Sequence, residues 1–226
     1  MTSANRNRIL RSLPPRESRI LTPNLRSVVL RKDAVLYEAG QRIKDVYFPE
    51  HAMISYVSGT SDGETIEVSV VGNEGVAGIE CLMEGVTAFR AVVQIPGRAH
   101  AVSYEFLKRE LGRCDVIQKA LLNYAKALYV QLGQTAVCNK FHSVEERFCR
   151  WLLVALDKSA ASSIPMTQDA LARVLGTRRA SVSGAASGFQ RRGTIRYTRG
   201  TISVLNRKHL EAQACECYET IASAHK

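Results

Sequence analysis

The spacing of hydrophobic positions changes twice along the chain. Between Val28 and Val102, short runs rich in β-branched and aromatic residues alternate with turn signals such as Asp62-Gly63 and Pro96-Gly97. In the run TIEVSVVG, alternation puts Ile66, Val68 and Val70 on one face and Glu67 and Ser69 on the other. Regular short runs without helical crossovers predict a small antiparallel barrel or sandwich.

A helical period follows. Apolar and small residues recur in steps of four, three and four, which predicts a long helix over residues 114–138. An ordinary core-facing helix would show a similar stripe. Because this helix would lie between two compact modules, we expect its stripe to mediate homodimerisation, through Ile117, Leu121, Tyr124, Leu128 and Thr135.

The C-terminal part has several helix start and stop signals. Ser143 and Glu146 have the spacing of a capping box, which predicts a helix with one apolar face. Thr167 is expected to cap a short helix that ends near Gly176. Thr177 is expected to cap a second helix, Arg178 to about Arg192, which stops at Gly193 and has an inner face of Val182, Ala185, Ala186 and Phe189.

Two short apolar strands, Ile195–Tyr197 and Ile202–Val204, then predict a hairpin. Two helices joined by a tight turn and followed by a hairpin make a winged helix-turn-helix. The expected fold class is therefore α+β: an antiparallel β-roll (residues 1–113), a dimerisation helix (114–138) and a winged helix-turn-helix domain (139–226).

Charge supports a nucleic-acid partner for the third part. The chain of 226 residues has a net charge of +10. Residues 163–208 contain nine Lys or Arg and one acid, Asp169, so they carry +8. A second basic stretch, residues 6–32, has no such structural pattern and is expected to be a solvated face. Double-stranded DNA is the natural partner of the C-terminal stretch.

The position of each arginine suggests a role. Arg178 and Arg179 begin the second helix, whose first turn enters the major groove in helix-turn-helix proteins. A guanidinium there can bond a phosphate or the acceptor edge of guanine. Arg191, Arg192, Arg196 and Arg199 lie near the helix end and the wing, where they would neutralise phosphates.

Neither a membrane span nor a secretory signal is recognisable, so we expect a cytoplasmic protein with reduced thiols. Cys215 and Cys217 could join His209 and His225 in a metal site, but C-x-C alone lacks half of a zinc pattern. We expect free thiols and no metal. Cys138 and Cys149 flank the junction between the long helix and the DNA-binding domain.

The order of modules resembles the Crp/Fnr family of bacterial transcription regulators over nearly the whole chain. The similar segments are residues 39–48 (AGQRIKDVYF), 70–79 (VVGNEGVAGI), 89–99 (FRAVVQIPGRA), 138–153 (CNKFHSVEERFCRWLL) and 167–189. The resemblance implies a dimer in which a small effector, often a cyclic nucleotide, binds the β-roll and repositions the DNA-reading domains. It also implies a palindromic operator, with RNA polymerase as a further partner.

Departures from the family pattern restrict which effector molecules this chain is expected to bind. The candidate effector pocket comprises Gly75, Val76, Gly78, Arg90 and Ala91. Val76 stands where the family's ribose-binding Glu would be, and Arg90-Ala91 follows a longer spacer without the hydroxyl residue. Since Val accepts no hydrogen bond, cyclic AMP is not expected to be the effector. No Cys precedes Cys81, so the iron–sulfur cluster of another branch is not expected either.

In the family, three positions of the second helix commonly read bases. They fall here on Arg179, Ala180 and Gly184, with Ser183 used in some branches. The predicted DNA-contacting set is Thr167, Gln168, Arg178, Arg179, Ala180, Ser181, Ser183, Gly184, Arg191, Arg192, Arg196 and Arg199.

The leading hypothesis is a homodimeric, sequence-specific transcription regulator under effector control. The alternative is a ligand-binding module that acts on a protein partner without reading DNA, which the small residues Ala180, Gly184 and Gly188 would favour. An enzyme is not expected, because no catalytic triad, phosphate-binding glycine loop or paired metal ligands are recognisable.

Overall fold

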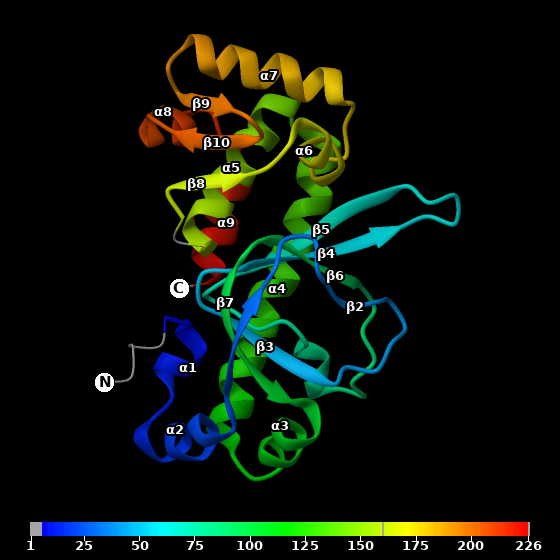
Figure 1. Cartoon of the computed structure of the whole chain (residues 1–226), viewed down its shortest axis with the longest axis vertical. Coiled ribbons are helices and arrows are strands. Elements are labelled where there is room, and N and C mark those ends of the chain that lie inside the picture. Colours follow the sequence, from blue (N-terminus) through cyan, green and yellow to red (C-terminus); the bar gives the residue numbers. More distant parts are fainter. Residues whose placement is uncertain (1–5, 160, 226) are drawn as a thin grey trace. The chain divides into compact units, whose positions relative to one another are not determined.

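The computed structural model describes residues 6–159 and 161–225, which form two compact units (Figure 1). The first unit contains the chain up to Val57 together with Val70–Leu128. The second contains Ser58–Ser69 and the chain from Tyr129 onward. This division falls inside the β4–β5 segment and inside the long helix.

The first unit is an antiparallel β-roll, as its alternating sequence predicts. One sheet has the strand order β1-β7-β3, and the other has the order β2-β6-β4-β5. The strands are β1 (Arg26–Leu30), β2 (Val35–Tyr37), β3 (Asp45–Pro49), β4 (Met53–Gly59), β5 (Thr65–Val71), β6 (Arg90–Ile95) and β7 (Gly97–Ser103).

Short helices flank the roll: α1 (Arg8–Ser12), α2 (Pro15–Leu21), η1 (Thr22–Asn24), η2 (Ile79–Leu82) and α3 (Tyr104–Leu111). Asn7 attaches the first of them to the sheets. Its side-chain oxygen caps α1 by accepting from the Leu10 amide at 3.2 Å, and its Nδ2 donates to the carbonyls of Pro49 and Gly75. Buried polar groups that are all paired in this way fix the position of the helix.

The long helix α4 (Asp115–Phe141) has 27 residues and ends three residues beyond the predicted end at 138. The structure places the predicted dimer stripe on the inner face of α4. Those residues are buried within the single chain, with exposed fractions of 7% or less: Ile117, Leu121, Tyr124, Leu128 and Thr135. The helical spacing of apolar residues correctly predicted which face of α4 is buried, and that face packs against the interior of the same chain.

In the part of the chain that the structure describes, the second unit contains a three-stranded sheet in the order β8-β10-β9 and the helices that follow α4. Ser143 and Glu146 form the predicted capping box at the start of α5, since each accepts from the other's amide, at 3.3 and 2.8 Å. The elements are α5 (Val144–Ser159), β8 (Ser163–Pro165), α6 (Gln168–Val174), α7 (Arg179–Arg191), β9 (Ile195–Thr198), β10 (Thr201–Val204), α8 (Arg207–Ala212) and α9 (Cys217–Ala224).

The first half of β5 shows the alternation of two faces that the sequence predicts. Glu67 and Ser69 are buried, whereas Ile66 and Val68 are partly exposed. A hydrogen bond within the second unit holds Glu67 on the buried face: the Trp151 indole Nε1 donates to Glu67 Oε1 at 2.8 Å, and both groups are buried. A charge-assisted bond of this kind compensates for removing the carboxylate from water.

Candidate nucleic-acid interface

Helices α6 and α7 form a helix-turn-helix around a glycine. Thr167 caps α6 as predicted, because its hydroxyl accepts from the Ala170 amide at 3.2 Å. Gly176 ends the helix with φ +57°, a left-handed conformation that suits glycine. The Arg147 guanidinium donates from inside the unit to the Leu175 carbonyl at 2.8 Å, which fixes the turn against α5.

The start of α7 differs from the prediction by one residue. Thr177 does not cap the helix, because its amide donates to the Ala172 carbonyl at 3.0 Å and so belongs to the end of α6. Arg178 is the N-cap instead, and its side chain makes no capping hydrogen bond with the described residues. Its guanidinium is therefore available to reach outward.

Burial divides α7 into two faces with helical spacing. The inner face is the predicted one, Val182, Ala185, Ala186 and Phe189, and all four are buried. Phe189 stacks on Phe148 of α5 with ring centroids 5.5 Å apart. The exposed residues of the outer face are Arg179, Ala180, Ser181, Gly184, Ser187, Gln190 and Arg191. The inner face anchors α7 and leaves a surface of small residues with arginines toward its ends.

Two of the predicted arginines are exposed and also contact a neighbouring side chain. The Arg192 guanidinium lies over the Phe189 ring, 4.7 Å from its centroid, at the end of α7. Arg179 Nε lies 3.4 Å from Asp169 Oδ1 of α6, and both side chains are more than half exposed. These two arginines are oriented by neighbours, whereas Arg178 and Arg191 project from the ends of α7.

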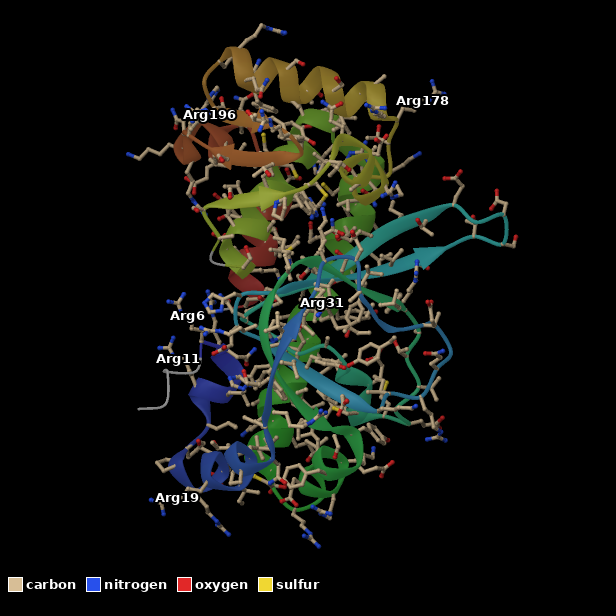
Figure 2. The ribbon with its side chains drawn as sticks, viewed as in Figure 1. Arg6, Arg11, Arg19, Arg31, Arg178 and Arg196 are labelled. Carbon is tan, nitrogen blue, oxygen red and sulfur yellow. The ribbon has the colours of Figure 1, made fainter. Side chains whose placement is uncertain are left out.

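The wing is a two-residue hairpin between β9 and β10. Arg199 and Gly200 at its tip both have positive φ, +49° and +73°, as a type I′ turn requires. Arg196 is exposed on β9, and the Tyr197 hydroxyl donates to the Met166 carbonyl at 2.8 Å, which ties the wing to the segment before α6. Figure 2 shows Arg178 and Arg196 extending away from the ribbon on opposite sides of the α7–wing surface.

A hollow of about 380 Å³ lies between α6, α7 and the wing. Its polar lining includes predicted DNA contacts and four residues outside the predicted set: Asp169, Ser187, Gln190 and Tyr197. Gln190 Oε1 accepts from the Tyr197 amide, which joins the helix to the wing. The missed residues organise the surface, and they could have been found only by knowing which elements lie side by side.

The predicted effector residues lie in the β-roll, where they do not form one polar pocket. Val76 and Ala91 are fully buried in the core, and the Gly78 amide donates to the Tyr56 hydroxyl at 3.0 Å. Arg90 points the other way: it is exposed and pairs with Glu38 at 3.2 Å. Because neighbours on a strand face opposite sides, Arg90 and Ala91 cannot line the same side of β6.

At Gly75, a Cβ atom would lie 2.2 Å from the Tyr124 ring, so α4 packs there directly against the backbone.

The second basic stretch is a solvated face, as expected. Its arginines are exposed along the first unit, where Arg6, Arg11, Arg19 and Arg31 extend from the ribbon (Figure 2). In the described part of the chain, no helix has the length and apolarity that crossing a membrane requires.

The arrangement of α6, α7 and a basic wing defines a winged helix-turn-helix domain joined by a long helix to a β-roll. Residues 146–213 match the family of Crp-like helix-turn-helix domains. The fold is similar to that of solved structures of Crp/Fnr-type transcription regulators, over 83–92% of this chain.

FixK2 from Bradyrhizobium japonicum has a TM-score of 0.72 and 18% identity, and the match covers 84% of this chain and 98% of that one. A protein described as a Crp/Fnr-family regulator, from Eubacterium rectale ATCC 33656, has a TM-score of 0.69 and 14% identity, and the match covers 92% of this chain and 98% of that one. A CRP-family transcriptional regulator from Thermus thermophilus has a TM-score of 0.68 and 16% identity, and the match covers 83% of this chain and 96% of that one. A search of characterised protein sequences finds no match.

Proposed function

We propose that this protein is a homodimeric, sequence-specific DNA-binding transcription regulator of the Crp/Fnr type, acting in the cytoplasm and without enzymatic activity. The observation that carries the proposal is the outer surface of α7, where small side chains lie between exposed arginines and beside a basic wing. Such a surface lets a helix approach the floor of the major groove while guanidinium groups reach phosphates on both sides.

Each residue of the predicted set then has a role. Arg179 reads a base edge, with a guanine in each half-site as its natural partner. Ala180 offers a methyl group to thymine, and Gly184 allows close approach, since a Cβ there would meet no described atom within 4 Å. Ser181 and Ser183 supply short hydroxyls. Thr167, Gln168, Arg178, Arg191, Arg192, Arg196 and Arg199 border the reading surface and contact phosphates.

The dimer interface is proposed to be the exposed side of α4, in place of the buried stripe. Leu122 and Tyr129 are apolar or aromatic, 52% and 80% exposed, and seven residues apart. Ala125, Leu132 and Ala136 complete a heptad-like series on the same side of the helix. Two such helices, one from each copy, would bury these side chains and present two α7 helices to DNA.

The effector is proposed not to be a cyclic nucleotide. Val76 is buried where an acceptor for the ribose would be needed, and Arg90 faces outward to Glu38 rather than toward a phosphate site. Calorimetric titration of the purified protein with cyclic AMP tests this. A dissociation constant below about 100 μM, equivalent to more than about 5.5 kcal/mol, would contradict it.

Selection of binding sites from random duplex DNA tests the proposed function. The full-length protein should select a palindrome whose half-sites are about one helical turn, ~34 Å, apart. Arg179→Ala should lose preference at one position of each half-site and cost about 1–3 kcal/mol. If Arg179→Ala returned the wild-type motif with uniformly lower affinity, Arg179 would contact only phosphate. If the wild-type protein selected no motif, the regulator proposal itself would fail.

A further inference from the structure

Three cysteines and one histidine converge in the second unit, away from the DNA-binding surface. Cys138 lies in the last turn of α4, and His142 directly follows that helix; Cys215 lies just before α9, and Cys217 is its first residue. Their ligand atoms all lie within 4.8 Å of one another. The three sulfurs are buried, and every cysteine in the chain is a free thiol.

The spacing of these atoms fits one tetrahedral metal ion. Cys138 Sγ and Cys215 Sγ are 3.5 Å apart, and Cys217 Sγ is 3.6 Å from His142 Nδ1. Ligands of a tetrahedral zinc ion, with Zn–S of about 2.3 Å and Zn–N of about 2.0–2.1 Å, are separated by roughly 3.5–3.8 Å. A disulfide would instead require about 2.05 Å between sulfurs.

The imidazole of His142 is oriented as a metal-binding histidine would be. Its Nε2 lies 3.2 Å from Glu216 Oε1, while Nδ1 faces the sulfur of Cys217. A neutral ring that carries its proton on Nε2 donates to the carboxylate and leaves the Nδ1 lone pair directed toward the thiols. A carboxylate or carbonyl on the second nitrogen is a recurrent feature of histidine ligands, because it fixes the tautomer and the ring orientation.

Packing alone accounts less well for this arrangement. A buried free cysteine behaves as a small apolar side chain, which would explain the burial of the three thiols. It would not explain why an imidazole nitrogen is directed at them, with its other nitrogen held by an acid. Hard cations such as Mg²⁺ and Ca²⁺ prefer oxygen ligands, so a thiolate-rich set selects a softer ion.

We propose that Cys138, His142, Cys215 and Cys217 form a structural zinc site of the Cys₃His type. Four protein ligands close the coordination sphere, so the ion has a structural role and no position open for catalysis. It fastens the start of α9 to the end of α4 within the second unit. The site is separate from the proposed DNA-reading function, because none of its ligands belongs to α6, α7 or the wing.

This site was not predicted from the sequence, because the candidate partners of the C-x-C pair were the nearby histidines His209 and His225. His209 instead shares a hydrogen bond with Thr194 at 2.7 Å, and His225 lies 3.3 Å from Lys158 Nζ. The missing half of the pattern is Cys138-x₃-His142, which puts two ligands on one face of a helix. The pairing is concealed because Cys215 follows Cys138 by 77 positions.

Elemental analysis of the full-length protein, purified with reductant and without chelator, tests the site. We expect one zinc ion per chain, and after exchange with Co²⁺ we expect thiolate-to-cobalt charge transfer and tetrahedral d–d absorption. Cys217→Ser should lose the metal, whereas Cys114→Ser, which changes a thiol outside the cluster, should keep it. Protein without stoichiometric metal, iron with inorganic sulfide, or a Cys138–Cys215 disulfide found by mass spectrometry of reductant-free samples would each overturn the proposal.

Two further variants keep the test valid if a ligand variant fails to fold. His142→Cys should retain the ion and increase the cobalt–thiolate absorption, because four thiolates replace three.

Glu216→Ala removes a side chain that is 74% exposed, so the fold should persist. Its zinc affinity, measured against a chromophoric chelator, should fall about 10–100-fold. Glu219→Ala, an exposed acid on the same helix, is the matched control and should bind zinc as the wild type does. Equal zinc affinities of the wild type, Glu216→Ala and Glu219→Ala proteins would contradict the orienting role of Glu216 and the proposed ligand set.

Discussion

Arg179 at the start of α7 and Asp169 of α6 form an ion pair, with 3.4 Å between Nε and Oδ1. Asp169 is the only acid among residues 163–208 and lines the hollow between α6, α7 and the wing. An exposed pair of this kind contributes little to stability, about 0–1 kcal/mol. Under the proposed function, the ion pair would hold the long Arg179 side chain in one orientation for contact with DNA.

We therefore expect Asp169→Asn to separate affinity from specificity. Removing the negative charge should strengthen binding to all DNA sequences, because phosphate repulsion is lost, while the freed Arg179 should discriminate less well between bases. Fluorescence anisotropy with the selected operator and a scrambled duplex gives both values. An unchanged ratio of the two affinities would show that the ion pair does not orient Arg179.

The tip of the wing gives a second prediction. Arg199 has φ +49°, a conformation that costs a non-glycine residue roughly 1–2 kcal/mol and that Asn adopts more readily. Arg199→Asn should therefore raise the free energy of unfolding by a few tenths of a kcal/mol to about 1 kcal/mol. It should also weaken binding to every DNA sequence alike and reduce the slope of log K against log salt by about 0.9.

Urea unfolding and DNA titrations over a range of salt concentrations measure these effects. Asn also differs from Arg in charge, so Arg199→Lys is the matched control. Lys keeps the charge at the same strained position, and its salt slope should remain close to that of the wild type. A variant Arg199→Asn with an unaltered salt slope would show that the wing tip does not touch the backbone of DNA.

Gly184 gives a third prediction, in which stability and binding change in opposite directions. A Cβ at this exposed helical position would meet no described atom within 4 Å. Gly184→Ala should therefore stabilise the protein by about 0.5–1 kcal/mol. If α7 lies as close to DNA as proposed, the added methyl group should lower operator affinity. Gly188→Ala is the control, since its Cβ would make only ordinary contact with Arg192 at 3.7 Å, and it should affect binding less.

Local pattern was sufficient to predict the elements whose partners lie nearby in sequence. The inner face of α7, the capping box at Ser143 and the wing hairpin all follow from periods and turn residues within short segments. Thr177 failed as a cap because Gly176 and Thr177 together complete the end of α6, and propensity alone does not fix the residue at which a helix starts.

Long-range partners could not be predicted in the same way. The stripe Ile117–Leu128 is apolar at helical spacing whether it packs against the same chain or against a second copy, so only the fold identifies the partner. The local pattern of β5 gives no sign that the partner of Glu67 is Trp151, 84 residues away. The Cys₃His cluster likewise combines two half-patterns that are each too weak alone.

The Glu67–Trp151 hydrogen bond gives a fourth prediction. Replacing Glu67 with Ala would leave the buried indole N–H without this acceptor, at a cost of about 1–3 kcal/mol in the free energy of unfolding. Glu67→Gln keeps an oxygen acceptor of similar size and should lose less. Urea unfolding followed by the fluorescence of Trp151, the single tryptophan, measures both. Equal losses for the Ala and Gln variants would mean that packing rather than the hydrogen bond stabilises this contact.

The exposed side of α4 gives the last prediction, which distinguishes the proposed interface from the buried stripe. Leu122 and Tyr129 are exposed in the single chain, so the double change Leu122→Glu and Tyr129→Glu should leave the fold intact. Two copies of α4 would then bring four carboxylates together, and the dimer should dissociate. Sedimentation velocity at low micromolar concentration should show a monomer, with the circular dichroism spectrum of the wild type.

Leu128→Glu is the contrasting variant, because Leu128 is only 7% exposed and packs inside its own chain. An ionised carboxylate there would be buried without a partner, so the thermal midpoint should fall sharply and the loss of dimer should accompany loss of structure. A folded dimer of the Leu122→Glu, Tyr129→Glu protein would rule out this side of α4 as the interface. A folded monomer of Leu128→Glu would restore the stripe that the sequence first suggested.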